Sequence, residues 1–156
     1  MPFRAGVADR WFGDYVPGVS YDCGSFVLTE DDIIRFAAEF DPMPFHVDRE
    51  AAQASGFGGL VASGAHALSL MTRQLVEHYH APQATIGGLG IDNLRIRKPI
   101  RPHVEFRVSA TVLEARVSRS KPDRGFLRTL AELTDESGDA AFHAELLQIM
   151  AVRPKR

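Results

Sequence analysis

The sequence of 156 residues has a single cysteine, Cys23, and no apolar run that approaches the roughly 18 residues of a membrane-spanning helix. One cysteine excludes an intrachain disulfide framework and a cysteine-based zinc site. The formal net charge of −2 gives no general attraction to nucleic acid or to an anionic membrane. The N-terminal stretch MPFRAGVADRWFGDYVPG also lacks the continuous apolar segment of a secretory signal. We therefore expect a cytoplasmic protein whose partner is neither nucleic acid nor membrane.

Length and composition predict a single domain. Apolar residues make up 45% of the chain and charged residues 24%, proportions that are typical of a globular domain with a sizeable core. Residues 1–24 are rich in aromatic side chains and glycine but show no periodicity, so we expect an irregular arm that packs on the body. Residues 25–153 would then form the domain.

The first clear helix is expected to begin at Thr29, because Thr29 and Asp32 have the spacing of a capping box. Apolar residues then recur at helical spacing as far as Phe40. Pro42 disfavours helical geometry at the residue before it, so Asp41 should lie just past the end of this helix.

Two more helices are expected before the strands begin. The segment VDREAAQASGFGG predicts a short helix that begins at Asp48. The segment LVASGAHALSLMTRQLVEHYH predicts the longest helix of the chain, and it has no charged residue before Arg73. A helix that is nearly free of charge over its first half should be surrounded by other parts of the protein.

The remaining sequence favours strands. Residues 104–112 alternate apolar and polar side chains, and residues 125–152 are predicted to form two strands joined by a turn at 136–139. Between Ile91 and Leu94 the apolar phase slips by one residue, which indicates a β-bulge. Consecutive strands with short turns form an antiparallel sheet, so the predicted fold class is α+β, with the long helix against one face of the sheet.

One short segment, EFDPMPFHVD, sets Asp41 and His46 five residues apart and links them through Pro42 and Pro44. Five residues is not the spacing of one helix face, and the prolines are expected to exclude a regular helix and to stiffen the link. The linking residues are apolar, so the two polar side chains should be held at the edge of an apolar surface. Taken alone, the pair fits a helix-ending carboxylate and a structural histidine better than a catalytic pair.

Three segments together resemble the MaoC-like family of (R)-specific enoyl-CoA hydratases and related dehydratases. They are FDPMPFHVD, FGGLVASGAHALSLM and LRIRKPIRPHVEFRVSATVLEARVSRSKPDRG, and the resemblance covers residues 20–152 approximately. The hydratase motif of the family reads Asp-x-Asn-Pro-x-His, and Asp41, Pro44 and His46 match it. Met43 stands at the Asn position, and His103 stands where many members have a Gly-Asp turn.

The resemblance implies a hot-dog fold, in which a curved antiparallel sheet wraps around a long central helix. It implies a homodimer or a dimer of dimers, with sheets joined edge to edge and the site at the subunit interface. The implied activity is that of a hydro-lyase, which reversibly hydrates a 2-enoyl-CoA to a 3-hydroxyacyl-CoA or dehydrates it. No cofactor is implied, since coenzyme A is part of the substrate.

The resemblance also implies roles for single residues. Asp41 and His46 would hold one water molecule between them and move protons, and Pro44 would help to keep the turn rigid.

Further along the chain, the resemblance assigns the backbone N–H of Gly64, eighteen residues after His46, to the thioester oxygen, where negative charge develops. A helix N-terminus offers unpaired N–H groups, and a glycine lets a ligand approach the backbone closely. Ser63 is expected to cap this helix. The Thr72 hydroxyl, eight residues after the glycine, matches a hydroxyl that supports the Asp–His pair in some members.

Coenzyme A carries phosphates, which require cations. The segment RIRKPIR offers four candidates within seven residues, namely Arg95, Arg97, Lys98 and Arg101. The segment SRSKPDRG adds Arg119, Lys121 and Arg124. No histidine pair in the sequence has the spacing of a metal site, so we expect no metal.

Two other functions stay open. A hot-dog thioesterase needs a carboxylate or a similar group on the long helix, and this helix has none before Glu77. A non-catalytic acyl-thioester-binding protein, or a partner subunit of a heteromeric hot-dog assembly, would fit the departures at Met43 and His103. If Asn normally braces the Asp–His turn, Met43 would replace that brace by packing.

Overall fold

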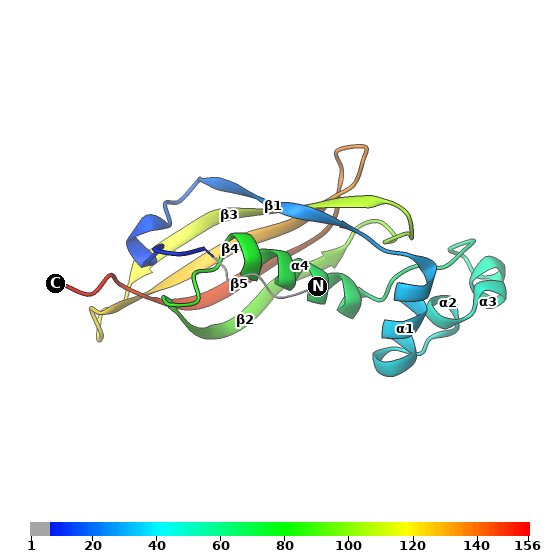
Figure 1. The fold of residues 1–156 in the computed structure, drawn as a ribbon, viewed down its shortest axis with the longest axis horizontal. Coiled ribbons are helices and arrows are strands. Elements are labelled where there is room, and N and C mark those ends of the chain that lie inside the picture. Colours follow the sequence, from blue (N-terminus) through cyan, green and yellow to red (C-terminus); the bar gives the residue numbers. More distant parts are fainter. Residues whose placement is uncertain (1–6) are drawn as a thin grey trace.

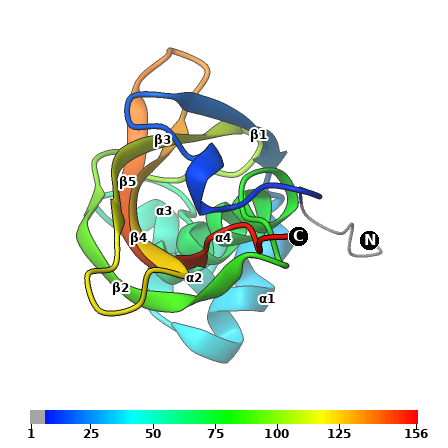
Figure 2. The same cartoon turned by 90° about the vertical axis from the view of Figure 1, so that its left-hand side faces the viewer.

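The computed structural model describes residues 7–156 and consists of a five-stranded antiparallel sheet curved around one long helix (Figures 1 and 2). The order of strands across the sheet is β1-β3-β4-β5-β2. In chain order the elements are the 3₁₀ turn η1 (Phe12–Asp14), β1 (Ser20–Val27), α1 (Glu30–Phe40), α2 (Pro44–Val47), α3 (Arg49–Ala54), α4 (Gly64–His78), β2 (Thr85–Ile96), β3 (Glu105–Val117), β4 (Arg124–Thr134) and β5 (Ala140–Ala151). The expected α+β class is confirmed.

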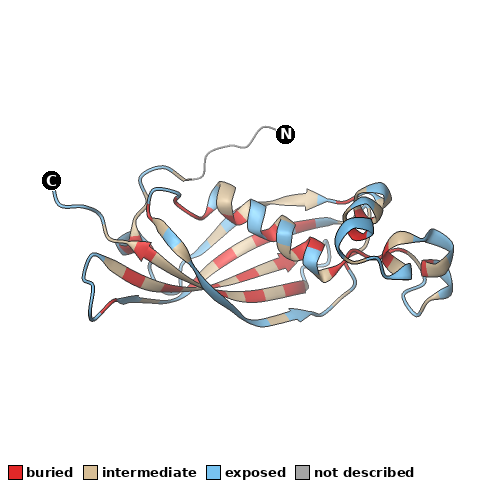
Figure 3. Ribbon diagram, turned by 90° about the horizontal axis from the view of Figure 1, so that it is seen from below, coloured by how far each residue is buried: buried red, intermediate tan, exposed pale blue. Residues whose placement is uncertain are grey.

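The core lies between the concave face of the sheet and one side of α4. Along β3, Phe106, Val108, Ala110 and Val112 are buried and alternate with exposed or half-buried polar residues, as the alternation in the sequence predicts (Figure 3). The buried stripe of α4 includes Met71, which is fully enclosed between helix and sheet. The turn predicted at 136–139 does connect β4 and β5.

The opposite side of α4 is open in the single chain. Ala65, Ser69 and Thr72 are exposed, so the sheet covers only one side of a helix that was expected to be surrounded. The first half of α4 therefore presents an uncharged face to the outside. No helix among residues 7–156 combines the length and apolar character needed to cross a membrane.

Strand β2 forms one edge of the sheet and carries the predicted bulge. Its register against β5 shifts between Asp92 and Arg95, and Asn93 between them has a φ of 51°. Four apolar side chains along β2 are about half exposed, namely Ile86, Leu89, Ile91 and Ile96. A long edge strand with exposed apolar side chains is a surface that other chains can pair with.

The N-terminal segment is more regular than expected. Strand β1 begins at Ser20 and pairs with β3, so the last residues of the expected irregular arm belong to the sheet. Ahead of β1, Phe12 and Tyr15 are buried, and the Tyr15 hydroxyl donates a hydrogen bond of 2.8 Å to the Tyr79 carbonyl. The arm thus packs on the body, as predicted. Residues 1–6 of the expected arm lie outside the described residues.

Helices α1, α2 and α3 lie together at one end of the molecule, and the C-terminus lies at the opposite end (Figure 1). The capping box of α1 is present, because the Thr29 hydroxyl accepts from the Asp32 N–H and the Asp32 carboxylate accepts from the Thr29 N–H. Asp48 caps α3 by accepting from the Ala51 N–H, also as predicted. The first cap fixes the start of α1, which ends at Asp41, and the second fixes α3, which directly follows the α2 turn that carries His46.

Candidate active site

Asp41 ends α1 as its C-cap. Its backbone N–H still donates to the Ala37 carbonyl, at 2.9 Å, but its φ of −156° and ψ of 68° lie outside the helical region. The change of direction at the residue before Pro42 follows the prediction. The side chain is 36% exposed, so the carboxylate lies where it can meet both water and protein.

The link between Asp41 and His46 contains one helical turn, which corrects the expectation that the prolines exclude a helix there. Pro44 occupies the first position of α2, where a missing N–H costs nothing and the fixed φ suits the helix. The Met43 carbonyl accepts from the His46 N–H at 2.8 Å, and the Met43 N–H donates to the Asp41 carbonyl at 2.8 Å. The Met43 side chain is 47% exposed, and these two backbone hydrogen bonds of Met43 brace the turn.

His46 is buried, and one of its ring nitrogens is engaged by the chain that precedes α4. Nδ1 lies within hydrogen-bond distance of the Val61 carbonyl oxygen. A carbonyl can only accept, so Nδ1 must carry the proton, and in the neutral ring Nε2 keeps a free lone pair. Nε2 lies 3.5 Å from Oδ2 of Asp41. In the neutral ring Nε2 and the carboxylate are both acceptors, so a donor such as water can bridge them.

Ser63, at the start of α4, contacts Asp41. Its hydroxyl accepts from the Ala65 N–H at 3.2 Å, which confirms it as the N-cap of α4. The same hydroxyl donates to Oδ2 of Asp41 at 2.7 Å. This second bond was not expected from the sequence, because Ser63 and Asp41 are far apart in the chain.

Gly64 is the first residue of α4, so its backbone N–H has no carbonyl partner within the helix. The Ile96 side chain from β2 lies directly against it, since a Cβ on Gly64 would come within 2.7 Å of Cδ1 of Ile96. The absence of a Cβ at Gly64 thus lets Ile96 pack this closely against the start of α4.

Asp41, His46 and Gly64 line one pocket of about 260 Å³. Its lining is apolar except for Asp41 and His46. The ten lining residues are Asp41, Phe45, His46, Phe57, Val61, Ala62, Gly64, Ile96, Pro99 and Ile100. The carboxylate and the imidazole, as two acceptors in an otherwise apolar cavity, can position a water molecule. The helix N-terminus beside them can stabilise a nearby negative charge.

Thr72 does not belong to this arrangement. Its hydroxyl donates to the Leu68 carbonyl of its own helix at 2.8 Å, and within residues 7–156 no hydrogen bond joins it to Asp41 or His46. The side chain lies on the exposed side of α4, two turns beyond Gly64. The expected support of the Asp–His pair is therefore not supplied by Thr72 within one chain.

The four basic residues expected to bind phosphates do not form one cluster. Lys98 is paired with Asp135 at 3.0 Å and with Asp139 at 2.6 Å, where its charge is already neutralised. Arg95 bonds only to the neighbouring Leu94 carbonyl, and Arg97 lies 3.5 Å from the ring of His143. Their role as phosphate contacts stays a prediction.

Arg101 alone among these four lies at the pocket. Its guanidinium donates to the carbonyl of Phe57, a residue that lines the cavity. The second predicted group lies at the end of the molecule away from α1–α3, where Arg119 and Lys121 belong to the turn between β3 and β4 and Arg124 begins β4 (Figure 1).

Two other buried histidines lie outside the pocket lining. His66 stacks on Phe36 with a ring separation of 4.3 Å, and burial lowers the pKa of His66 below its ordinary value of 6.5. His80, at the far end of α4, is more deeply enclosed, and burial lowers the pKa of His80 to about 4. Both rings therefore favour the neutral state.

His103 adopts a backbone conformation that explains the Gly-Asp turn of the resembled family. Its φ is 64°, in the left-handed region that glycine enters most easily, and its N–H donates to the Leu28 carbonyl at 2.7 Å. The departure at His103 thus keeps the turn and places a side chain at a position suited to glycine.

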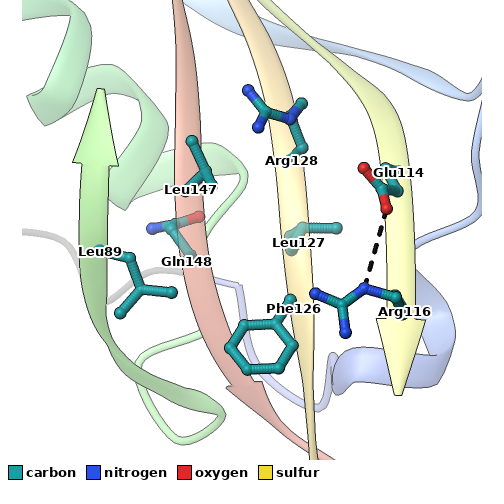
Figure 4. Close-up of a pocket in the computed structure, with 8 residues that line it drawn as sticks. All are labelled: Leu89, Glu114, Arg116, Phe126, Leu127, Arg128, Leu147 and Gln148. Carbon is teal, nitrogen blue, oxygen red and sulfur yellow. Dashed lines mark ion pairs between the residues drawn. The ribbon is translucent and has the colours of Figure 1, made fainter. Parts of the chain in front are cut away.

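A second depression, of about 250 Å³, lies across β2, β3, β4 and β5 (Figure 4). Its charged side chains are already paired. Glu114 lies 3.9 Å from Arg116, and Arg128 lies 3.0 Å from Asp92 on β2. None of the predicted site residues lines this depression, so it is not the candidate active site.

Comparisons with known proteins agree with the geometry. The family model described as "MaoC like domain" matches residues 16–130. The uncharacterised protein YdeM of Bacillus subtilis is 29% identical over 133 residues, which are 85% of this chain and 93% of that protein. The crystal structure of a MaoC-like dehydratase from Rhodospirillum rubrum is 34% identical and superposes with a TM-score of 0.87, covering 94% of this chain and 99% of the other.

A more distant structure shares the fold. R-hydratase PhaJ1 from Pseudomonas aeruginosa, without ligand, is 21% identical and has a TM-score of 0.72, covering 94% of this chain and 92% of the other. The hot-dog architecture expected from the sequence is confirmed.

Proposed function

Since this chain belongs to the MaoC-like domain family, with hydratases and dehydratases among its structural neighbours, we propose that it reversibly hydrates a 2-enoyl-CoA to a 3-hydroxyacyl-CoA. The observation that carries the proposal is the placement of His46. Its Nδ1 lies within hydrogen-bond distance of the Val61 carbonyl, and its Nε2, which has a lone pair in the neutral ring, lies 3.5 Å from Oδ2 of the Asp41 carboxylate. This pair of acceptors opens into an apolar pocket beside the start of α4.

A water molecule that donates one hydrogen to Nε2 and the other to the Asp41 carboxylate would satisfy both acceptors. Its oxygen would then direct a lone pair into the pocket, where C3 of an enoyl thioester can lie. Because the turn is held by the backbone bonds of Met43 and begins its helix with Pro44, the water would be oriented before the substrate binds. General base catalysis of this kind contributes about 10²–10⁴ in rate.

In the proposed reaction the water oxygen forms a bond to C3 while Nε2 of His46 takes one of the water protons. The double bond shifts toward C2, and negative charge moves to the thioester oxygen. The N–H of Gly64 would donate a hydrogen bond to that oxygen, and the positive end of the α4 dipole would add to the stabilisation. The proton on Nε2 then passes to C2, so the elements of water have been added and His46 returns to its starting state.

We further propose a homodimer joined along β2. This strand is an edge of the sheet, twelve residues long, with four half-exposed apolar side chains. Ile96, at its end, also lines the pocket, so a partner on β2 would close the site and cover the uncharged face of α4. Cytoplasmic acyl-CoA would be the substrate pool, and Arg101 at the pocket is our candidate for a phosphate contact.

The experiment that tests this function is hydration of crotonyl-CoA by the purified chain, followed by the loss of enoyl absorbance. We expect hydration, and in the reverse assay we expect dehydration of the (R)-3-hydroxyacyl-CoA. Longer and branched enoyl-CoAs are included so that a narrow acyl preference is not mistaken for inactivity. No turnover with any of them would contradict the proposal and would favour a binding protein or a partner subunit of a heteromer. Hydrolysis of the saturated acyl-CoA instead would favour a thioesterase.

A further inference from the structure

We propose that Ser63 is a positioning residue, which orients the Asp41 carboxylate for the reaction and links it to the N–H of Gly64. The inference rests on the proposed function and adds a residue to its site. The Ser63 hydroxyl is 1% exposed and does not line the pocket, so it would act through Asp41 rather than on the substrate.

The direction of both hydrogen bonds follows from the chemistry of the partners. The Ala65 N–H can only donate, so the Ser63 oxygen accepts it, at 3.2 Å. The Asp41 carboxylate can only accept, so the single hydroxyl proton points to Oδ2, at 2.7 Å. Because the Ser63 oxygen already accepts the N–H of the cap, its proton is free to point at Asp41. Ser63 is therefore a donor of fixed direction.

Asp41 needs such a donor. The carboxyl torsion of aspartate has a broad preference, and at 36% exposure the group has little packing to hold it. His46 cannot hold it directly, because its Nε2 is an acceptor in the neutral ring and lies 3.5 Å away. With Oδ2 held by Ser63, the carboxylate plane is set and Oδ1 stays free of protein donors among the described residues.

Ser63 and Gly64 are neighbours at the start of α4, so one turn of backbone serves two functions. Ser63 fixes the carboxylate that would bind water, and Gly64 presents the N–H that would bind the thioester oxygen. The distance between the water and the oxyanion site is then set by one dipeptide rather than by the packing of α1 against α4. This role is the one that the resemblance assigned to the Thr72 hydroxyl, whose bond goes to Leu68 instead.

The test separates capping from positioning with three variants at one site. Ser63→Ala loses the cap and the donor, Ser63→Gly loses the donor but keeps most of the capping, and Ser63→Thr keeps both. We expect kcat for crotonyl-CoA hydration to fall about 10- to 100-fold in both Ala and Gly variants, with KM within about twofold, because misplacement of a catalytic group by about 1 Å has costs of this size. Ser63→Thr should restore at least a third of the rate.

Ser69→Ala is the matched control, because Ser69 is on the same helix and its hydroxyl bonds, among the described residues, only to the Ala65 carbonyl. Its kcat should equal that of the unchanged protein. If Ser63→Gly retains the normal kcat while Ser63→Ala does not, Ser63 is only a helix cap and the inference is overturned.

A second measurement does not depend on turnover. The side-chain carboxyl ¹³C resonance of Asp41 should move in Ser63→Ala and in Ser63→Gly, and should stay near its original position in Ser63→Thr. An Asp41 resonance unchanged in all three variants would overturn the inference even if the chain has no hydratase activity. Absence of hydration by the unchanged chain, with the expected resonance shifts, would refute the proposed function and leave the positioning role in place.

Discussion

His80 should make the fold sensitive to acid, and the size of the effect follows from its surroundings. The ring is 7% exposed, its Nδ1 has no hydrogen-bond partner among the described residues, and Gln148 approaches its Nε2 at 3.4 Å. Burial lowers the pKa of His80 to about 4, from the ordinary value of 6.5 that it regains on unfolding.

Between these two pH values the unfolded chain binds a proton that the folded chain does not, so stability falls as the pH is lowered. The slope approaches 1.4 kcal/mol per pH unit, and the total loss between pH 7.5 and pH 4 is about 3 kcal/mol. Well above pH 6.5 the ring is neutral in both states, and His80 contributes no pH dependence.

The assay is the free energy of unfolding from urea titrations between pH 4 and pH 7.5, for the unchanged protein and for His80→Gln. The variant keeps a neutral polar group near Gln148 and should lose about 3 kcal/mol less over this range. His78→Gln, the same exchange at an exposed position nearby, controls for the substitution itself. Parallel pH dependence of His80→Gln and the unchanged protein would refute the reasoning.

Three further predictions concern the site and the sheet edge. Gly64→Ala should fold, because its Cβ would meet at 2.7 Å only the end of the half-exposed Ile96 side chain, which can move. Because Ile96 lines the pocket, its displacement should hinder the approach of the thioester to the Gly64 N–H and lower kcat/KM by about 10²-fold; a near-normal value would contradict the assigned N–H. Arg101→Ala should raise the KM for enoyl-CoA several-fold while Lys98→Ala, whose charge is paired with two aspartates, should not, and equal KM changes would remove Arg101 as the phosphate contact. Ile91→Lys on β2 should turn the dimer into a monomer in light-scattering measurements, whereas an unchanged mass would exclude pairing along this edge.

Local chemistry in the sequence was enough to predict most of the fold. The capping box at Thr29, the alternation along β3 and the slip near Asn93 each depend on a few neighbouring residues, and each is present as predicted. The irregular arm was predicted too long because the residues of β1 before Phe26 have little alternation, and their pairing with β3 is set by contacts distant in the chain.

The site could be predicted only in part. Asp41 and His46 were found because their spacing is local and matches a motif, and Gly64 because it matches a second segment of the family. The bond from Ser63 to Asp41 and the Val61 carbonyl that holds His46 join segments separated by fifteen residues or more, so no local pattern reports them. The ion pairs of Lys98 could not be predicted for the same reason, because its aspartate partners come from the turn between β4 and β5.

The most direct test of the central claim is kcat for crotonyl-CoA hydration by Asp41→Asn and His46→Gln. Both variants keep the size of the side chain, and Asp31→Asn and His78→Gln make the same exchanges at exposed positions outside the pocket. The account predicts that each site variant, folded to the same melting temperature within a few degrees, loses about 10²-fold or more, while the two controls keep the full rate. Site variants that hydrate crotonyl-CoA as fast as their controls would show that Asp41 and His46 do not hold the reacting water.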